Sequence, residues 1–280
     1  MTPLLLFLLT FLTTLVAGAF LSGGDPLARP SDLIPGLMFN LPLLAILGIH
    51  EMGHYTAARR HQVVTTPPYF IPFLPIPPLP GTMGAVIKLK SPFPDRNALM
   101  DIGSAGPLAG AIVAIPVLMA GLALSEIRRT TGGLGSELGE SLLFKLLSRI
   151  VLGEIPAGHD VFLHPMGYAG WLGLYITMLN LIPAGQLDGG HIAYAVLGRR
   201  AKWVSLATLI ATLLLTLRST SWIAMAVIML AMAFFLGLRH PHVTYGEEPL
   251  DPTRKKIALF AAVMFILCFT PVPIEMFFGQ

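Results

Sequence analysis

The sequence is poor in charged residues and has a single cysteine. Only 12% of its 280 residues are Asp, Glu, Lys or Arg, about half the share found in a soluble domain. With 54% hydrophobic residues and a mean hydropathy of +0.73, the composition excludes an ordinary soluble domain and predicts a polytopic membrane protein. The lone Cys268 excludes an internal disulfide and a cysteine-rich metal site.

Features of a cleaved signal peptide and of a separate soluble domain are also missing. The first apolar segment has no basic leader and no A-x-A motif, so we expect residues 1–22 to remain as a span. No internal repeat is found. We therefore expect one integral-membrane domain over residues 1–280, with core spans within about 36–200 and additional spans at 1–22, 201–217, 221–238 and 257–278.

Apolar segments define the expected fold class, an all-α polytopic membrane protein with about six to seven transmembrane helices. After the segment 166–183, which stops at Pro183, residues 184–198 are expected to form a small amphipathic helix rather than a span. The full set of apolar segments is about 3–22, 36–58, 98–124, 166–183, 201–217, 221–238 and 257–278.

The distribution of Lys and Arg predicts the orientation, because cytoplasmic loops carry an excess of them. If the segment 36–58 ends in the cytoplasm, twelve of the 18 basic residues fall in cytoplasmic loops and six on the opposite side. This distribution places the N-terminus inside and the C-terminus outside.

The segment 36–58 contains the motif His50-Glu51-Met52-Gly53-His54. HExxH places two imidazoles one helical turn apart on one face, where both can bind one zinc ion. Glu51 can then act on a water molecule at the metal, as in metalloproteases. His and Glu are costly within a bilayer and are usually functional there. The alternative is two polar helix residues that neighbouring helices satisfy.

A proline-rich segment and a strand pattern follow the motif. Residues 67–80 read PPYFIPFLPIPPLP, which cannot form a helix and is expected to be a re-entrant loop or to lie on the membrane surface near the cytoplasmic face. Residues 81–90, GTMGAVIKLK, end in an alternation typical of a strand in a small β-hairpin or sheet. We expect its edge, at Gly84, Ala85, Val86 and Ile87, to pair with an extended peptide. A purely structural hairpin is the alternative.

A zinc site needs a third protein ligand, and Asp188 is the best candidate. It lies in Asn180-Leu-Ile-Pro-Ala-Gly-Gln-Leu-Asp188-Gly-Gly, after a span that stops at Pro183, so it should sit at a helix break near the cytoplasmic face. Taken alone, the LDGG segment would favour an ordinary helix-capping aspartate.

The pair HExxH and NxxPxxxLDGG strongly resembles the site-2 protease family of intramembrane zinc metalloproteases. The resemblance extends through residues 81–110 and 164–191, about half the chain, and is closest to the compact branch without a PDZ or CBS domain. It implies that His50, His54 and Asp188 hold one zinc ion per chain and that Glu51 is the general base, which later passes its proton to the leaving amine.

The resemblance also places Asn180 near the active site, where its amide could bind substrate backbone or the oxyanion. An interhelical hydrogen bond is the alternative. His191 and Asp101 are candidates to orient a metal ligand, although a capping or surface role is the simpler interpretation of Asp101. The Gly106–Gly110 step predicts close helix packing.

The expected function is therefore hydrolysis of peptide bonds in transmembrane segments of other membrane proteins. The expected partners are a transmembrane protein or peptide substrate and the lipid bilayer, with no nucleic acid. We expect the inner membrane of a prokaryote, or alternatively a chloroplast membrane, with the active site toward the cytoplasm. A membrane metal-ion transporter, with His and Asp as a transit site, is the rival hypothesis.

Overall fold

The protein is mostly helical, as its composition predicts. The computed structural model describes residues 2–76, 79–129, 135–235, 237, 243–244 and 248–277. In these ranges the helices are α1 (Pro3–Leu21), α2 (Leu33–Arg60), α3 (Arg96–Ala123), α4 (Leu142–Leu152), α5 (Pro165–Asn180), α6 (Asp188–Leu197), α7 (Ala201–Thr216), α8 (Ile223–Phe235) and α9 (Pro252–Cys268). Short 3-10 turns precede α2, α7 and α8: η1 (Pro30–Asp32), η2 (Gly198–Arg200) and η3 (Thr220–Trp222).

In the described part of the chain, three helical segments are long and apolar enough to cross a membrane: Pro3–Leu21, Pro30–Arg60 and Arg96–Ala123. The other apolar helices are shorter, with 16 residues in α5, 16 in α7, 13 in α8 and 17 in α9. A membrane-crossing helix needs about 20 residues unless the bilayer thins around it. The number of six to seven spans therefore stays a prediction.

Strands among the described residues pair into three small antiparallel sheets, so the fold is not purely α-helical. β1 (Tyr69–Pro72) pairs with β2 (Thr82–Val86), which confirms the hairpin predicted from residues 81–90. The other two sheets were not predicted. They are β3 (Glu126–Arg129) with β5 (His159–Phe162) and β4 (Gly135–Leu138) with β6 (Ile274–Phe277).

The last predicted span, 257–278, was placed too far along the chain. Helix α9 begins at Pro252, with the Asp251 side chain accepting from the backbone of Arg254, and it ends at Cys268. Pro271 and Pro273 follow, and a proline cannot continue a helix because it lacks the N–H and clashes with the preceding turn. The chain is extended beyond them in β6.

The proline-rich segment is more regular than expected. Residues Tyr69–Pro72 form β1, and Pro72 ends that strand, where a missing N–H costs least. Residues 77–78 lie outside the described part of the chain. The Thr13 hydroxyl of α1 donates to the carbonyl of Gly81 at 2.7 Å, so the hairpin is attached to the first helix. Re-entry into the membrane stays a prediction.

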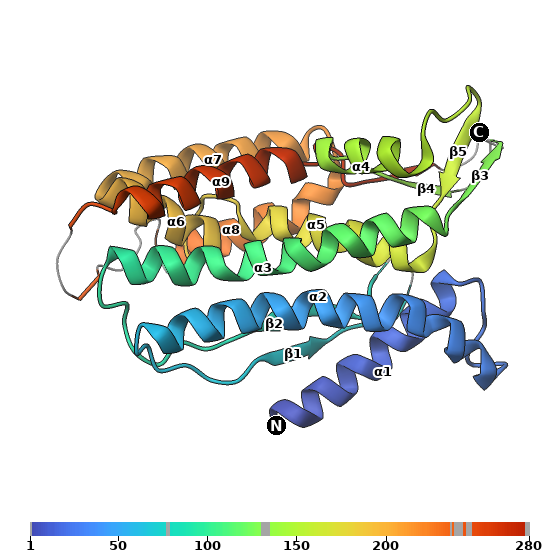
Figure 1. Ribbon diagram of the computed structural model, residues 1–280, viewed down its shortest axis with the longest axis horizontal. Helices are drawn as coiled ribbons and strands as arrows, with labels where there is room; N and C mark the ends of the chain where they lie inside the picture. Colours follow the sequence, from blue (N-terminus) through green and yellow to red (C-terminus); the bar gives the residue numbers. More distant parts are fainter. Residues whose placement is uncertain are drawn as a thin grey trace.

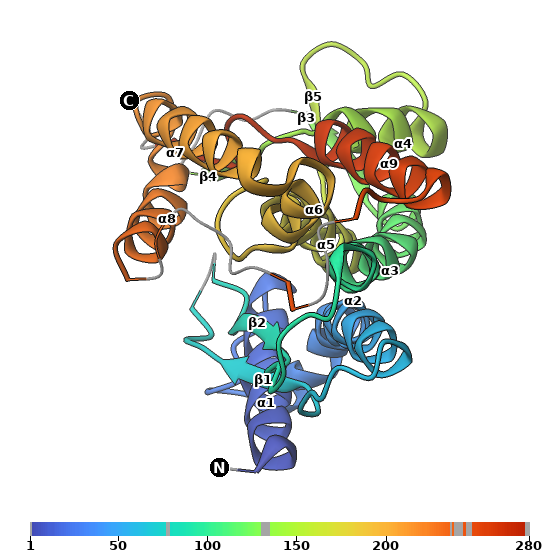
Figure 2. The same cartoon turned by 90° about the vertical axis from the view of Figure 1, so that its left-hand side faces the viewer.

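Helix α3 runs along the length of the molecule between two groups of elements (Figure 1). Helices α1 and α2 and the β1–β2 sheet lie on one side, and α5, α6 and α9 lie on the other, as the end view in Figure 2 also shows. Side chains fully removed from solvent, such as Phe39, Leu43, Leu99 and Leu118, form the core between these layers. Between helices in a bilayer, such side chains stabilise the packing through van der Waals contacts rather than through removal from water.

The predicted helix break before Asp188 is confirmed. Helix α5 ends at Asn180, and α6 begins at Asp188 and ends at Leu197, within the range predicted for the amphipathic helix. Gly189 packs directly against the carbonyl of Leu181, where any side chain would overlap the backbone. The break therefore folds back on the end of α5 and turns the start of α6 toward α2.

Candidate metal centre

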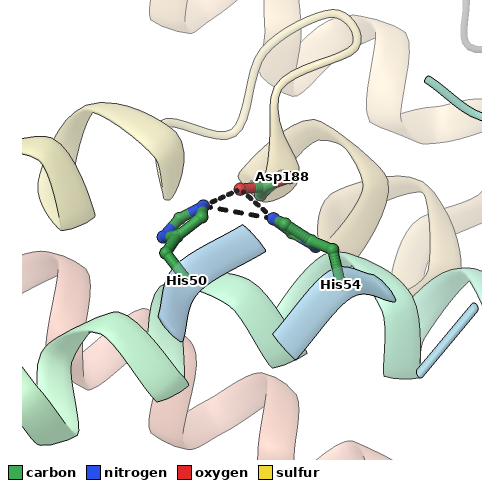
Figure 3. A group of neighbouring side chains, drawn as sticks. All are labelled: His50, His54 and Asp188. Atoms are coloured by element: carbon green, nitrogen blue, oxygen red, sulfur yellow. Dashed lines mark hydrogen bonds and ion pairs between the residues drawn. The ribbon is translucent and has the colours of Figure 1, made fainter. Parts of the chain in front are cut away.

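Three side chains converge between α2 and α6 (Figure 3). His50 and His54 project from one face of α2, and Asp188 approaches them from the first turn of α6. Asp188 Oδ2 lies 3.2 Å from His54 Nε2 and 3.5 Å from His50 Nε2, and the two Nε2 atoms are 3.1 Å apart. Both imidazoles are buried. The structure therefore brings the three predicted ligands together.

The three atoms fit the spacing of ligands around one metal ion. Zinc bonds of 2.0–2.1 Å in a tetrahedron place neighbouring ligand atoms about 3.3 Å apart. The three observed separations, 3.1, 3.2 and 3.5 Å, lie close to that value. Two imidazoles and one carboxylate also leave the fourth tetrahedral position for water or substrate, as catalytic zinc sites require.

His54 is oriented by a backbone carbonyl of α3. Its Nδ1 lies 2.7 Å from the carbonyl oxygen of Ile102, which can only accept a hydrogen bond. The proton therefore belongs on Nδ1, and the lone pair of Nε2 points at Asp188 and His50. Such a partner fixes the ring and the tautomer of a metal ligand. The sequence could not predict this hydrogen bond, because every residue type has a backbone carbonyl and its position depends on the packing of α3 on α2.

Glycines of α3 make room for the two imidazoles. A Cβ at Gly106 would overlap the His54 ring, and a Cβ at Gly110 would lie 3.2 Å from His50 Nδ1. Gly53 of α2 packs on the carbonyl of Ala105 in the same interface, where a Cβ would lie 2.5 Å from that oxygen. The Gly106–Gly110 step was interpreted as a helix-packing feature, and it also forms the wall behind His50 and His54.

Glu51 lies beside the cluster without joining it. Its Oε1 is 4.0 Å from His50 Nε2, and the backbone N–H of Ile87 donates to its carboxylate. The side chain is buried. A carboxylate held next to the ligands, and fixed by a donor from the residue after β2, is placed to accept a proton within the site.

A cavity of about 240 Å³ opens at the cluster. Asn180, the last residue of α5, reaches into it with Nδ2 3.4 Å from His50 Nε2. Of the predicted strand edge, Ala85, Val86 and Ile87 line the cavity and Gly84 does not. Gln186 also lines it, and the sequence did not predict this residue although it stands only two positions before Asp188. The lining consists of His50, Glu51, His54, Ala85, Val86, Ile87, Leu89, Ile102, Asn180, Gln186, Leu187, Asp188 and His191.

His191 and Asp101, the two residues predicted as candidates to orient a metal ligand, lie in different surroundings. His191 lines the cavity, and its ring packs against Phe93 at 5.3 Å between centroids. Asp101 does not orient His50 or His54. Its carboxylate binds His61 Nε2 at 2.8 Å and Arg254 Nε at 2.9 Å, and the hydrogen bond from Arg254 to Asp101 raises the pKa of Arg254 above its usual range. Asp101 thus joins the end of α2, the start of α3 and the start of α9.

Comparison with known proteins agrees with this geometry. Residues 38–217 match the model of Peptidase family M50, a range that includes all the residues of the cluster. The chain is 40% identical over 190 residues to "Probable zinc metalloprotease EGY1, chloroplastic" of Arabidopsis thaliana, covering 63% of this chain and 34% of that protein.

Two further chloroplastic relatives are similar over more of the chain. "Probable zinc metalloprotease EGY2" of Arabidopsis thaliana is 30% identical over 259 residues, 90% of this chain and 44% of the relative. "Probable zinc metalloprotease EGY3" of Oryza sativa subsp. japonica is 28% identical over 282 aligned positions, 85% and 44% of the two chains. The chain thus spans less than half the length of these relatives. The family match covers more than half of the sequence and confirms the resemblance to the site-2 proteases: the chain belongs to Peptidase family M50.

Proposed function

We propose that this chain is a zinc metalloendopeptidase that hydrolyses peptide bonds in transmembrane segments of other membrane proteins. The observation that carries the proposal is the cluster of His50, His54 and Asp188, with Glu51 beside it, on helices of which α2 is long enough to cross a bilayer. Membership of a peptidase family supports the reaction class, and the relatives' printed names support zinc as the metal.

In this proposal His50, His54 and Asp188 hold one zinc ion. A bound zinc ion supplies Lewis acidity, which polarises a substrate carbonyl and makes water a nucleophile at neutral pH. The protein supplies the orientation: Ile102 fixes the ring of His54, and the α5–α6 turn delivers Asp188 from the opposite side.

Glu51 has the role of the general base. Its carboxylate accepts a proton from the attacking water and donates that proton to the nitrogen of the departing amine. The N–H of Ile87 restrains one side of the carboxylate and leaves the other side toward the cavity. Burial keeps bulk water from competing for the same proton.

Asn180 has the role of a hydrogen-bond donor to substrate. Its Nδ2 lies at the rim of the cluster, 3.4 Å from His50 Nε2, where an amide N–H can meet a substrate carbonyl oxygen that gains negative charge. The alternative role for Asn180 is a hydrogen bond between α5 and α2 that only holds the two helices together.

The edge of β2 has the role of a substrate platform. A transmembrane helix bonds its own amides internally, so it must unwind before its backbone can reach the site. Pairing with a strand edge satisfies the exposed amides again. Ala85, Val86 and Ile87 line the cavity, and β1 covers only one edge of β2. The N–H of Ile87, the residue after β2, donates to Glu51, so we expect substrate to pair with β2 along this side of the cavity.

The membrane placement follows the same proposal. The site lies toward the cytoplasmic side with the N-terminus inside, as the distribution of Lys and Arg predicts. A prokaryotic inner membrane and a chloroplast membrane both fit, and the printed names of the relatives favour the plastid lineage of this family.

The geometry favours a protease over a metal transporter. Transport requires a row of polar sites along a path through the membrane. Among the described residues, the cluster at His50 is the one group of three potential metal ligands. A single buried site beside a carboxylate fits catalysis better than transit.

The test is cleavage by the full-length protein reconstituted in proteoliposomes with a panel of single-span membrane proteins. Wild type should consume at least one of them, and Glu51→Gln should lose at least about 100-fold in rate while retaining one zinc per chain by mass spectrometry. Glu154→Gln, an exposed glutamate far from the cluster, is the matched control and should behave as wild type. Near-normal turnover by Glu51→Gln would overturn the role of Glu51, and multiple labile zinc ions per chain would favour transport.

A further inference from the structure

A second cavity lies at the end of the molecule where α3 begins and α6 ends. Its volume is about 380 Å³. Among the residues that the structure describes, its walls are apolar and basic side chains without Asp or Glu: Arg96, Val196, Leu197, Arg200, Pro249, Leu250 and Lys255. It shares no lining residue with the cavity at the metal ligands.

The three cations of this cavity come from three separate parts of the chain. Arg96 begins α3, Arg200 belongs to η2, and Lys255 lies in the first turn of α9. Arg200 and Lys255 are exposed and form no ion pair with any described residue. Gathering like charges costs free energy unless an anion compensates them. The positive charge of the cavity is therefore suited to binding an anion.

Arg96 also gives the site a fixed edge. Its Nε and Nη2 donate to the carbonyls of Ala195 and Val196, each at 2.8 Å. These bonds satisfy carbonyls at the C-terminus of α6 and hold the guanidinium at the rim of the cavity. The cation at this edge is thus positioned before any ligand arrives.

The start of α3 places the cavity at the membrane boundary that we expect from the length of this helix. Arg96 is the first residue of a segment long enough to span the bilayer, so the cavity stands where that span meets the aqueous boundary. Nearby Trp203 is 63% exposed with Lys202 Nζ 4.8 Å from its ring centroid, a pairing typical of the membrane interface. Val196 and Leu197 of the cavity wall are exposed and apolar, as a surface covered by lipid would be.

We propose that this cavity binds the headgroup phosphate of an anionic phospholipid. Arg200 and Lys255 supply the positive charge, Arg96 closes one edge, and Val196 and Leu197 contact the glycerol and upper acyl region. Basic pockets between helices at a membrane boundary bind anionic headgroups through the same combination of charge and apolar contact. A headgroup in this position would link η2 and α9 across the end of α6, the helix that begins with Asp188.

The test compares lipid binding by the full-length protein in a neutral detergent. Native mass spectrometry would count retained dioleoylphosphatidylglycerol or dioleoylphosphatidylcholine, and tryptophan fluorescence would follow thermal unfolding with each lipid or with inorganic phosphate. Phosphatidylglycerol should be retained and should raise the Tm more than phosphatidylcholine. In the double variant Arg200→Gln/Lys255→Gln, binding of phosphatidylglycerol should weaken roughly thirtyfold, because two cations next to the headgroup are lost.

The matched control is the double variant Lys202→Gln/Lys256→Gln, which removes the same charge from neighbouring positions that do not line the cavity. It should bind phosphatidylglycerol as wild type does. Equal weakening in both double variants would mean general surface attraction and would overturn the site. An equal rise in Tm with inorganic phosphate alone would overturn a lipid as the ligand. Neither readout depends on peptidase activity, so the result is independent of the proposed function.

Discussion

Polar groups are organised differently at the two ends of the molecule. At the metal end the interacting side chains are buried or half-buried and far apart in sequence, as His54 and Asp188 show. At the opposite end, around β3 and α4 in Figure 1, ion pairs such as Arg128–Glu126 and Arg149–Glu154 are exposed and join residues at most five positions apart. Exposed local pairs contribute little, whereas buried polar groups are costly unless something compensates them. Burying polar side chains lowers the stability of the fold, and this protein does so at the proposed metal site.

The largest effect should come from removing a metal ligand. We expect His54→Ala or Asp188→Ala to lose zinc, measured per chain by mass spectrometry, and to reduce cleavage to background, because two ligands hold zinc poorly. His159→Ala, at the opposite end in β5, should change neither quantity. Full zinc occupancy in both ligand variants would rule out this ligand set, and with it the functional difference between the two ends of the molecule.

The next effect should come from the glycine behind His54. Gly106→Ala puts a Cβ into the imidazole, so either α2 and α3 separate or the ring leaves its position. We expect about 1–3 kcal/mol of destabilisation and 10- to 100-fold weaker zinc binding. In Gly48→Ala, on α2, the added Cβ would have only Phe70 within 4 Å, at 3.8 Å, so normal zinc affinity is expected there. Equal zinc affinity in the two variants would show that the wall formed by α3 is not needed.

An intermediate effect should come from the free edge of β2. Ala85→Pro removes the backbone N–H of a residue that lines the cavity, and we expect kcat/KM to fall roughly 10- to 100-fold with zinc content unchanged. Ala85→Ser keeps the N–H and should cleave at nearly the wild-type rate. If the proline variant is folded, zinc-loaded and fully active, the hairpin is only a scaffold.

The smallest effect should come from the ion pairs themselves. Asp101→Asn weakens the contacts with both His61 and Arg254, which join three helices, and should lower the free energy of unfolding by about 1 kcal/mol. Arg149→Gln breaks an exposed pair at the other end and should leave the unfolding curve unchanged. Thermal unfolding of the two variants in the same detergent measures the difference. Equal changes in Tm would show that ion pairs at the two ends contribute equally to stability.

The sequence alone determined the parts of this protein that depend on local patterns. HExxH within an apolar helix identified His50, Glu51 and His54, because two ligands one turn apart need only the geometry of a helix. Pro183 and the following glycines identified the break before Asp188, and the pattern in residues 81–90 predicted a strand, of which β2 takes up 82–86. Each of these signals is contained within about a dozen residues.

Tertiary structure decided the features that depend on packing between distant segments. The carbonyl of Ile102 on His54, the wall at Gly106 and the pairing of Asp101 with Arg254 each join parts of the chain that no local pattern relates. The sheets formed by β3 with β5 and β4 with β6 likewise pair segments that are far apart in sequence. Periodicity reports which face of a segment is apolar, but the partner of that face is chosen by the packing of the whole chain.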